Sequence, residues 1–305
     1  MTFFWILLAL ASGFALRRLP LNAPRLAKGL NTYVLWVCLP ALTLAMAVEL
    51  PLEWRILLPA SVAWFGFVLA GGWVLLGQKW LGWDRATTGC LWLTTGLANT
   101  SFVGFPLIRW LYGEDALWIA LLIDQPGSFL VLSTLGLVAG AYFAGDSSQQ
   151  PAWHTILLRI VRFPPFVCFA LALALNLGGF HWPALPDALL RSVAATLTPA
   201  ALLAVGLQLE LGHWERYLRP LSYGLLFRLG IAPVLVALFY GGVLGLSGEM
   251  LGVSVLEGGM APMITASIVA SGMGLNPPLA SLMVSVGIAL SLVTVPLWYA
   301  VLQLF

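Results

Sequence analysis

Residues 96–107, GLANTSFVGFPL, place two glycines, a proline and three small polar side chains inside an otherwise apolar stretch. In the hydrocarbon of a membrane, an unpaired backbone amide or carbonyl is costly. A helix is therefore interrupted there only where protein or a water-filled cavity satisfies the freed groups. A second stretch of the same kind, residues 257–267, EGGMAPMITAS, lies in the other half of the chain. Paired interruptions of this kind indicate the substrate site of a transporter.

The composition identifies the environment of the chain. Hydrophobic residues make up 61% of the sequence and charged residues only 9%, whereas soluble domains carry about 25% charged residues. The chain is therefore expected to be an all-α polytopic protein of the lipid bilayer. A net charge of +2 without a basic block gives no support to nucleic acid as a partner. The three cysteines lie in apolar runs without metal-ligand spacing, which predicts buried thiols and no metal site.

Apolar runs long enough for the roughly 30 Å hydrocarbon layer predict ten transmembrane helices. The expected ranges are 3–16, 30–49, 56–77, 86–111, 116–143, 155–176, 187–209, 220–246, 249–272 and 278–304. Arg17 and Arg18 follow the first run instead of preceding it, so a retained helix is expected there and not a signal peptide. With the N-terminus outside, ten Lys and Arg side chains of the loops fall on the cytoplasmic side and three on the outer side. Both termini are therefore predicted on the outer side of a bacterial inner membrane.

The polar connection over residues 144–154 divides the chain into two units of five helices, 1–143 and 155–305. Because each unit has an odd number of spans, the second unit must start on the opposite side of the membrane. The sequence thus predicts two inverted repeats of five helices, with an interrupted helix in fourth place in each, which are helices 4 and 9.

The two interruptions supply the polar groups of the expected site. Asn99, Thr100 and Ser101 offer hydrogen bonds in the first, and the missing amide of Pro106 frees the carbonyl of Phe102. In the second, Pro262 is followed by Thr265 and Ser267. If the two broken helices cross, their half-helix N-termini bring partial positive charge to one point, which favours a carboxylate or another anion. The alternative is a pair of ordinary proline kinks with small residues for close helix packing.

Ionisable residues inside the membrane are functional candidates because each is costly there. Asp124, followed by Gln125 and a proline, is the expected proton carrier or cation ligand. Glu257 either shares that role or caps the nearby half-helix. Arg228 binds a substrate carboxylate, pairs with Asp124 or Glu257, or extends to the headgroups. The expected substrate-binding set is Asn99, Thr100, Ser101, Pro106, Arg228, Met260, Pro262, Thr265 and Ser267, and the ion-coupling set is Asp124, Gln125 and Glu257.

Catalytic patterns are missing from the sequence. It has no Walker A loop, and no histidine stands beside an embedded carboxylate or cysteine. The chain is thus expected to be a secondary transporter and not an enzyme, with Na⁺ or H⁺ as a coupling ion and no other cofactor. A non-transporting sensor or interaction subunit and a channel are the alternatives.

Five motifs resemble the auxin efflux carrier family and its bacterial members. They are NTY at 31–33, LPAL at 39–42, NTSFVGFPL at 99–107, LEGGMAP at 256–262 and SLVTVPL at 291–297. The resemblance implies ten helices in two inverted repeats, a fourth and a ninth helix that cross at Pro106 and Pro262, and Asn99 as the polar group of the first crossover. The related fold is that of the bile-acid sodium symporters, so a sodium-coupled carrier of that kind is a further alternative.

The same resemblance implies a scaffold of helices 1, 2, 6 and 7, a mobile transport unit of helices 3–5 and 8–10, and elevator-type alternating access. It also implies homodimers through the scaffold and small organic anions as substrates, auxin-like acids or dicarboxylates. Two features depart from the family pattern. The chain lacks the long cytoplasmic loop of many plant carriers, and Ser101-Phe102-Val103 replaces the usual small-and-glycine pattern after the crossover asparagine.

Overall fold

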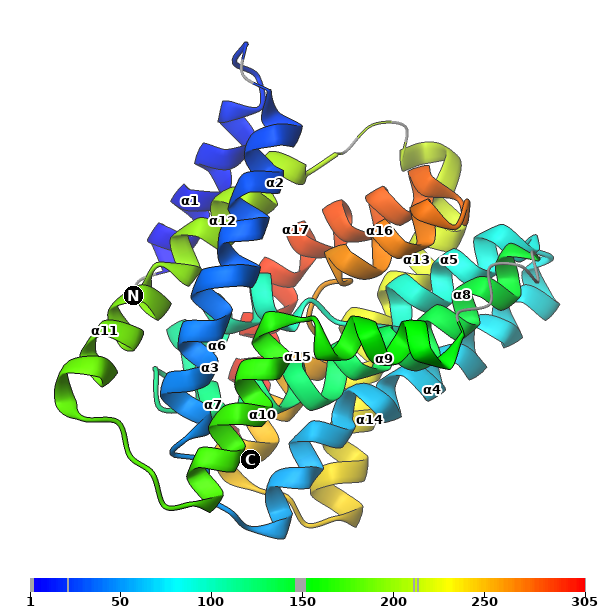
Figure 1. Ribbon diagram of the computed structural model, residues 1–305. Helices are drawn as coiled ribbons and strands as arrows, with labels where there is room; N and C mark the ends of the chain where they lie inside the picture. Colours follow the sequence, from blue (N-terminus) through cyan, green and yellow to red (C-terminus); the bar gives the residue numbers. More distant parts are fainter. Residues whose placement is uncertain (1–2, 21, 146–151, 211, 213, 305) are drawn as a thin grey trace.

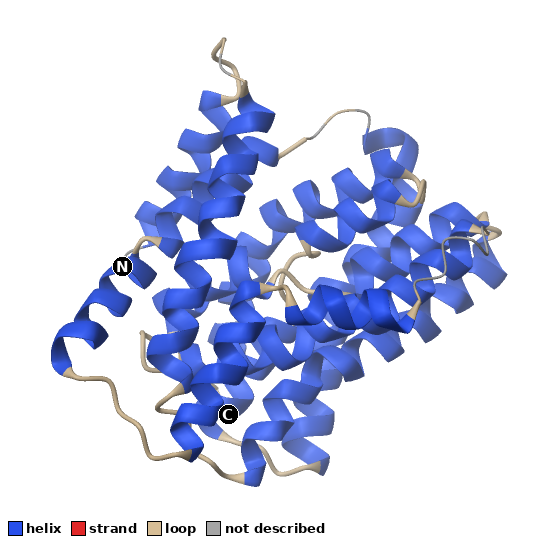
Figure 2. Ribbon diagram, in the orientation of Figure 1, coloured by secondary structure: helices blue, strands red, loops and turns tan. Residues whose placement is uncertain are grey.

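The computed structural model describes residues 3–20, 22–145, 152–210, 212 and 214–304. Most of the connection expected over 144–154 therefore lies outside the described residues. Within the described part the chain consists of helices joined by loops (Figure 2), and the one β-type pairing there is an isolated bridge between Ala98 and Pro262.

The helices of the first half run from α1 to α8, with π-helical or 3₁₀ turns (η) between several of them. In chain order they are α1 (Phe3–Leu16), α2 (Ala23–Tyr33), η1 (Val34–Cys38), α3 (Leu39–Ala47), η2 (Trp54–Ile56), α4 (Leu57–Leu81), α5 (Arg85–Gly96), η3 (Thr100–Gly104), α6 (Phe105–Leu111), α7 (Leu117–Leu122), η4 (Ile123–Phe129), η5 (Leu132–Gly136) and α8 (Leu137–Ala144).

The second half continues in the same manner to α17. Its elements are α9 (Trp153–Val161), α10 (Pro164–Leu177), α11 (Ala184–Ala195), α12 (Leu197–Gln208), η7 (Trp214–Tyr217), α13 (Leu218–Leu226), η8 (Phe227–Ile231), α14 (Ala232–Val236), η9 (Ala237–Val243), α15 (Gly248–Gly258), α16 (Ile264–Gly272) and α17 (Pro277–Leu302).

Several helices are long and apolar enough to cross a membrane. Six continuous helical runs meet that condition: 23–47, 54–81, 117–144, 184–208, 214–243 and 277–302. The pair α9 and α10 makes a seventh if it is counted as one span. The remaining segments expected to span are the short α1 and the two interrupted helices. The chain is thus a multi-pass helical membrane protein.

Capping residues explain where two of the helices begin. Asn22 accepts a hydrogen bond from the amide of Arg25, and Pro24 lies in the first turn of α2. This signal starts the helix at Ala23, so the expected start at residue 30 was too late. Asp84 caps α5 in the same way, through the amide of Thr87 at 2.7 Å.

The helix expected over 155–176 is bent by 70° between α9 and α10. The bend falls at Arg162 and Phe163, immediately before Pro164 and Pro165. Neither proline has an amide hydrogen to bond to the preceding turn, so α9 ends there and α10 starts with both prolines in its first turn. The range expected as one span is therefore two helices joined by a bend.

The helices pack in two groups (Figure 1). In one group, α12 packs against α1 and α2, while α3 packs against α10 and α11. In the other, α5 packs against α4, α8, α16 and α17, and α14 packs against α15. The broken segments lie where the two groups meet, since η3 contacts α12 as well as η4.

Candidate functional site

The two interruptions lie directly against each other. Leu97 has an extended backbone (φ −114°, ψ 123°) after the end of α5 at Gly96. The amide of Asn99 donates to the carbonyl of Ala261 at 2.8 Å, and the amide of Met263 donates to the carbonyl of Leu97 at 2.9 Å. Each break thus satisfies backbone groups of the other, as a buried non-helical segment at membrane depth requires.

The crossing point in the first broken helix is Ala98 and not Pro106. Ala98 and Pro262 face each other in the antiparallel bridge, and the two hydrogen bonds come from the residues on either side. Pro262 therefore needs no amide hydrogen at this position. Pro106 lies in the first turn of α6, after the π-helical turn η3, and the helix continues through it. The expectation that Pro106 marks the crossing was wrong for this reason.

Four helix ends meet at the crossing. The helices α5 and α15 end there, while η3 and α16 begin there at Thr100 and Ile264. Helix N-termini carry partial positive charge and unpaired amides, and helix C-termini carry partial negative charge. The crossing therefore offers both kinds of partial charge to a bound molecule or ion.

A cavity of about 110 Å³ opens beside the crossing. It brings together four of the residues expected in the site, Asn99, Ser101, Asp124 and Thr265. The remaining lining residues are Leu35, Phe102, Phe129, Leu132, Arg159, Phe163, Met263 and Ile264. We call this the crossing cavity.

Asp124 is the centre of a buried hydrogen-bond network. The hydroxyls of Thr100 and Ser101 both donate to its Oδ1 atom, and Gln125 Nε2 donates to Oδ2 at 2.7 Å. Because Asp124 lies on η4 and both hydroxyls lie on η3, the network joins the fifth helical run to the first broken helix. The buried carboxylate thus has a donor on each oxygen, as a charge at this depth requires.

Asn99 combines a structural bond with a free donor. Its Oδ1 accepts from the amide of Phe102 at 3.1 Å and caps η3. Its Nδ2 is buried and has no hydrogen-bond partner among the described residues. A buried donor without a partner is costly, so a ligand that accepts this bond in the crossing cavity gains stability.

Arg228 and Glu257 do not line the crossing cavity. They face a separate space of about 10 Å³ together with Gly96 and Ser128. Arg228 Nη1 donates to the carbonyls of Thr95 and Gly96, both at 3.3 Å. The Glu257 carboxylate lies against Gly104 of the other broken helix, where a Cβ atom would come within 2.5 Å of both oxygens.

The other expected residues are near the crossing but outside its cavity. Met260 is buried at the second break, and Gln125 acts through Asp124. Ser267 lines a different cavity of about 390 Å³ between α16 and α12, beside the ion pair of Arg17 and Glu210.

Two lining residues of the crossing cavity, Arg159 and Phe163, are absent from the expected site. From the sequence, Arg159 is counted among the positive residues on the cytoplasmic side, because Lys and Arg next to apolar runs are typical of cytoplasmic loops. Only the bend before Pro164 and Pro165 brings this end of α9 over the crossing. The adjacent proline pair was the sequence signal for that bend.

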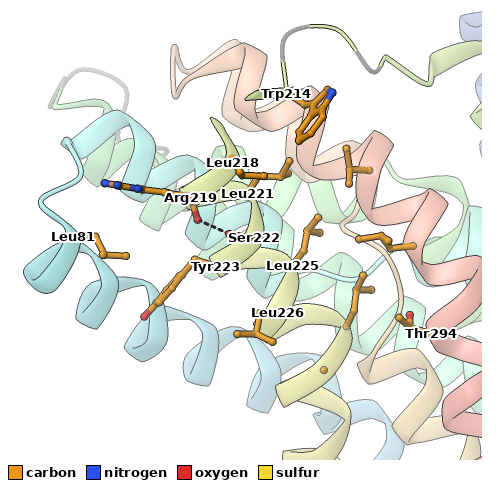
Figure 3. A pocket seen from close by; sticks show the side chains of 14 residues that line it. Leu81, Trp214, Leu218, Arg219, Leu221, Ser222, Tyr223, Leu225, Leu226 and Thr294 are labelled. Carbon is orange, nitrogen blue, oxygen red and sulfur yellow. Dashed lines mark hydrogen bonds between the residues drawn. The ribbon is translucent and has the colours of Figure 1, made fainter. Parts of the chain in front are cut away.

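A larger hollow lies elsewhere, between α13 and α17 (Figure 3). It measures about 1100 Å³ and is lined chiefly by leucines with Tyr223 and Trp214. The hydroxyl of Ser222 bonds back to the carbonyl of Arg219 at 3.1 Å. This hollow lacks converging polar groups, so its lining suits lipid chains better than a polar solute.

A multi-pass helical bundle with two broken helices paired at their breaks, and with buried polar groups beside them, defines a membrane transporter. The model of the family described as "Membrane transport protein" matches residues 1–299. The chain therefore belongs to this family, and the resemblance to the auxin efflux carriers is confirmed.

Individual relatives agree with the family. An "Uncharacterized transporter" of Methanothermobacter thermautotrophicus is 29% identical over 97% of this chain and 96% of its own length. The "Uncharacterized transporter YfdV" of Escherichia coli K12 is 25% identical over 70% of this chain and 67% of its own. The "Uncharacterized transporter MJ1031" of Methanocaldococcus jannaschii is 28% identical over 45% of this chain and 43% of its own. The chain is thus a transporter and not an enzyme.

Proposed function

We propose that this protein is a secondary active transporter of a small organic anion in a bacterial inner membrane. The observation that carries the proposal is the crossing cavity, which Asn99 lines and beside which two helices begin. The buried Nδ2 of Asn99 has no hydrogen-bond partner among the described residues. The unpaired donor and the partial positive charge of the two helix N-termini both favour an anionic ligand.

The transport cycle is proposed to be of the elevator type, on ten spans arranged as two inverted repeats. The division of packing into two groups supports this, because the expected helices 1, 2, 6 and 7 correspond to α1, α2, α3, α9, α10, α11 and α12, most of which belong to the first group and would form the scaffold. The other helices would form the moving unit that carries the crossing. Homodimers through the scaffold helices and termini on the outer side belong to the same proposal.

Asp124 is proposed as the coupling group, through binding of Na⁺ or H⁺. It lines the crossing cavity next to Asn99, whereas Glu257 lies outside that cavity. The charge of Asp124 would therefore act at short range on an anion bound in the crossing cavity. Binding of Na⁺ or H⁺ to Asp124 would neutralise that charge and so couple the ion to the substrate.

Uptake into proteoliposomes tests the function. The purified protein would be offered a panel of labelled monocarboxylates and dicarboxylates, with the sodium gradient, the proton gradient and the membrane potential varied one at a time. We expect saturable accumulation of at least one carboxylate under one gradient. Sodium dependence would favour a mode like that of the bile-acid symporters. Binding without flux would favour a sensor, and purely conductive flux a channel.

A further inference from the structure

The crossing cavity contains one cationic side chain, Arg159, among the described residues that line it. Arg159 lies in the last turn of α9, and Phe163 of the following bend lines the same cavity. The ring of Phe163 stacks on Phe129 at a centroid distance of 4.0 Å. This stack fixes the end of α9 against η4, the element that carries Asp124.

The guanidinium of Arg159 has no carboxylate partner within the described part of the chain. The ion pairs found there involve Arg17, Arg109 and Arg191. Asp124 lines the same cavity but forms no ion pair with Arg159, and its oxygens already accept three bonds from Thr100, Ser101 and Gln125. A half-buried guanidinium without a counter-charge has five donors to offer to an anion.

We propose that Arg159 binds the carboxylate group of the transported anion, assisted by Asn99 Nδ2. This inference rests on the proposed function and adds the residue that recognises the charge. Asn99 and Arg159 line one cavity. Among the described residues, Asn99 Nδ2 has no hydrogen-bond partner and Arg159 has no ion-pair partner. A planar guanidinium matches the two oxygens of a carboxylate, so it selects this group over a neutral amide of equal size.

The other residues that line the crossing cavity favour a substrate with a single carboxylate group. Leu35, Phe102, Phe129, Leu132 and Met263 offer no charge, and the one acidic side chain would repel a second carboxylate. A dicarboxylate would therefore leave one charge without a partner in an apolar space. The cavity should prefer a monocarboxylate with an apolar body.

The proposal is tested with Arg159→Gln and Arg159→Lys in the uptake assay, using a monocarboxylate that the unaltered protein transports. Arg162→Gln is the matched control, because Arg162 lies on the next turn, is exposed and does not line the cavity. We expect Arg159→Gln to raise KM about tenfold or more, as loss of a charged hydrogen bond implies. Arg159→Lys should retain part of the affinity, because it keeps the charge without the planar fork.

Competition by the neutral amide of the same substrate provides a second readout. The unaltered protein should be inhibited far better by the carboxylate than by the amide, and Arg159→Gln should lose most of this preference. Equal KM and equal preference in Arg159→Gln and Arg162→Gln, at equal yields of monodisperse protein, would overturn the proposal. An unaltered protein that moves no anion would instead overturn the proposed function itself.

Discussion

Asn99 has two roles that substitution can separate. In Asn99→Asp the side chain keeps the acceptor for the Phe102 amide but loses the Nδ2 donor and adds a negative charge. In Asn99→Ala both functions are lost. We expect both variants to lower anion uptake at least tenfold, because each removes a donor that faces the substrate. Initial rates in proteoliposomes provide the measurement.

Stability distinguishes the two variants of Asn99. Asn99→Ala should lose about 1 kcal/mol of stability from the missing cap without loss of folded yield. Asn99→Asp keeps the cap but buries a second carboxylate in the cavity that Asp124 lines, so it should lose more stability than Asn99→Ala. Undiminished uptake in both would remove Asn99 from the substrate site.

Asp124→Asn should separate ion coupling from substrate movement. The amide fills the same volume but carries no charge, so it neither binds Na⁺ strongly nor carries a proton. We expect gradient-driven accumulation to disappear, while exchange of labelled against unlabelled substrate continues. Loss of coupling in Glu257→Gln but not in Asp124→Asn would place the coupling group at Glu257 instead.

At the scale of the element, α1 and α12 approach each other through a pair of glycines. A Cβ atom on Gly206 would overlap the carbonyl oxygen of Leu10 and would lie 3.0 Å from the Cα of Gly13. These are backbone atoms, so the helices themselves must move apart. Small residues at such a contact let two membrane helices pack closely.

Gly206→Ala should therefore destabilise the protein by about 1–3 kcal/mol through overpacking, and thermal unfolding in detergent measures the loss. Gly72→Ala is the matched control, because Gly72 also lies inside a helix but has nothing within 4 Å of its Cβ position. It should be neutral or slightly stabilising, since alanine favours helices. Equal effects of the two substitutions would refute the close contact.

At the scale of the whole molecule, an elevator cycle requires the two groups of helices to slide past each other. The amide of Glu210, which follows α12, donates to the hydroxyl of Ser285 on α17 at 2.8 Å and joins the groups. The variant Glu210→Cys with Ser285→Cys, in a background with Cys38, Cys90 and Cys168 changed to Ser, should form a disulfide that stops transport. Reduction should restore it.

A second disulfide inside the proposed scaffold provides the control. Cys38 Sγ and Thr196 Oγ1 lie 3.3 Å apart, so Thr196→Cys should form a disulfide with Cys38 in a background that keeps Cys38 and has only Cys90 and Cys168 changed to Ser. That bond should leave transport intact, because both residues belong to helices that remain fixed relative to each other. Transport that survives oxidation of the Glu210–Ser285 pair would contradict the sliding motion.

The sequence by itself determined the class of the protein and the location of its two breaks. Burial of an apolar surface in lipid requires helices, and a cluster of glycine, proline and small polar residues marks where a helix can break, so both signals are local. The same local chemistry marked Asn99, Ser101, Asp124 and Thr265, which line one cavity.

Only the tertiary structure decided which residues meet. The register of the crossing, Ala98 with Pro262, depends on the geometry of two backbones far apart in sequence. The bend before α10 brought Arg159 to the cavity, while Arg228 on η8 and Glu257 on α15 line a separate space. Charge and polarity are properties of a residue, but a shared cavity is a property of how the helices pack, and no single stretch of sequence contains it.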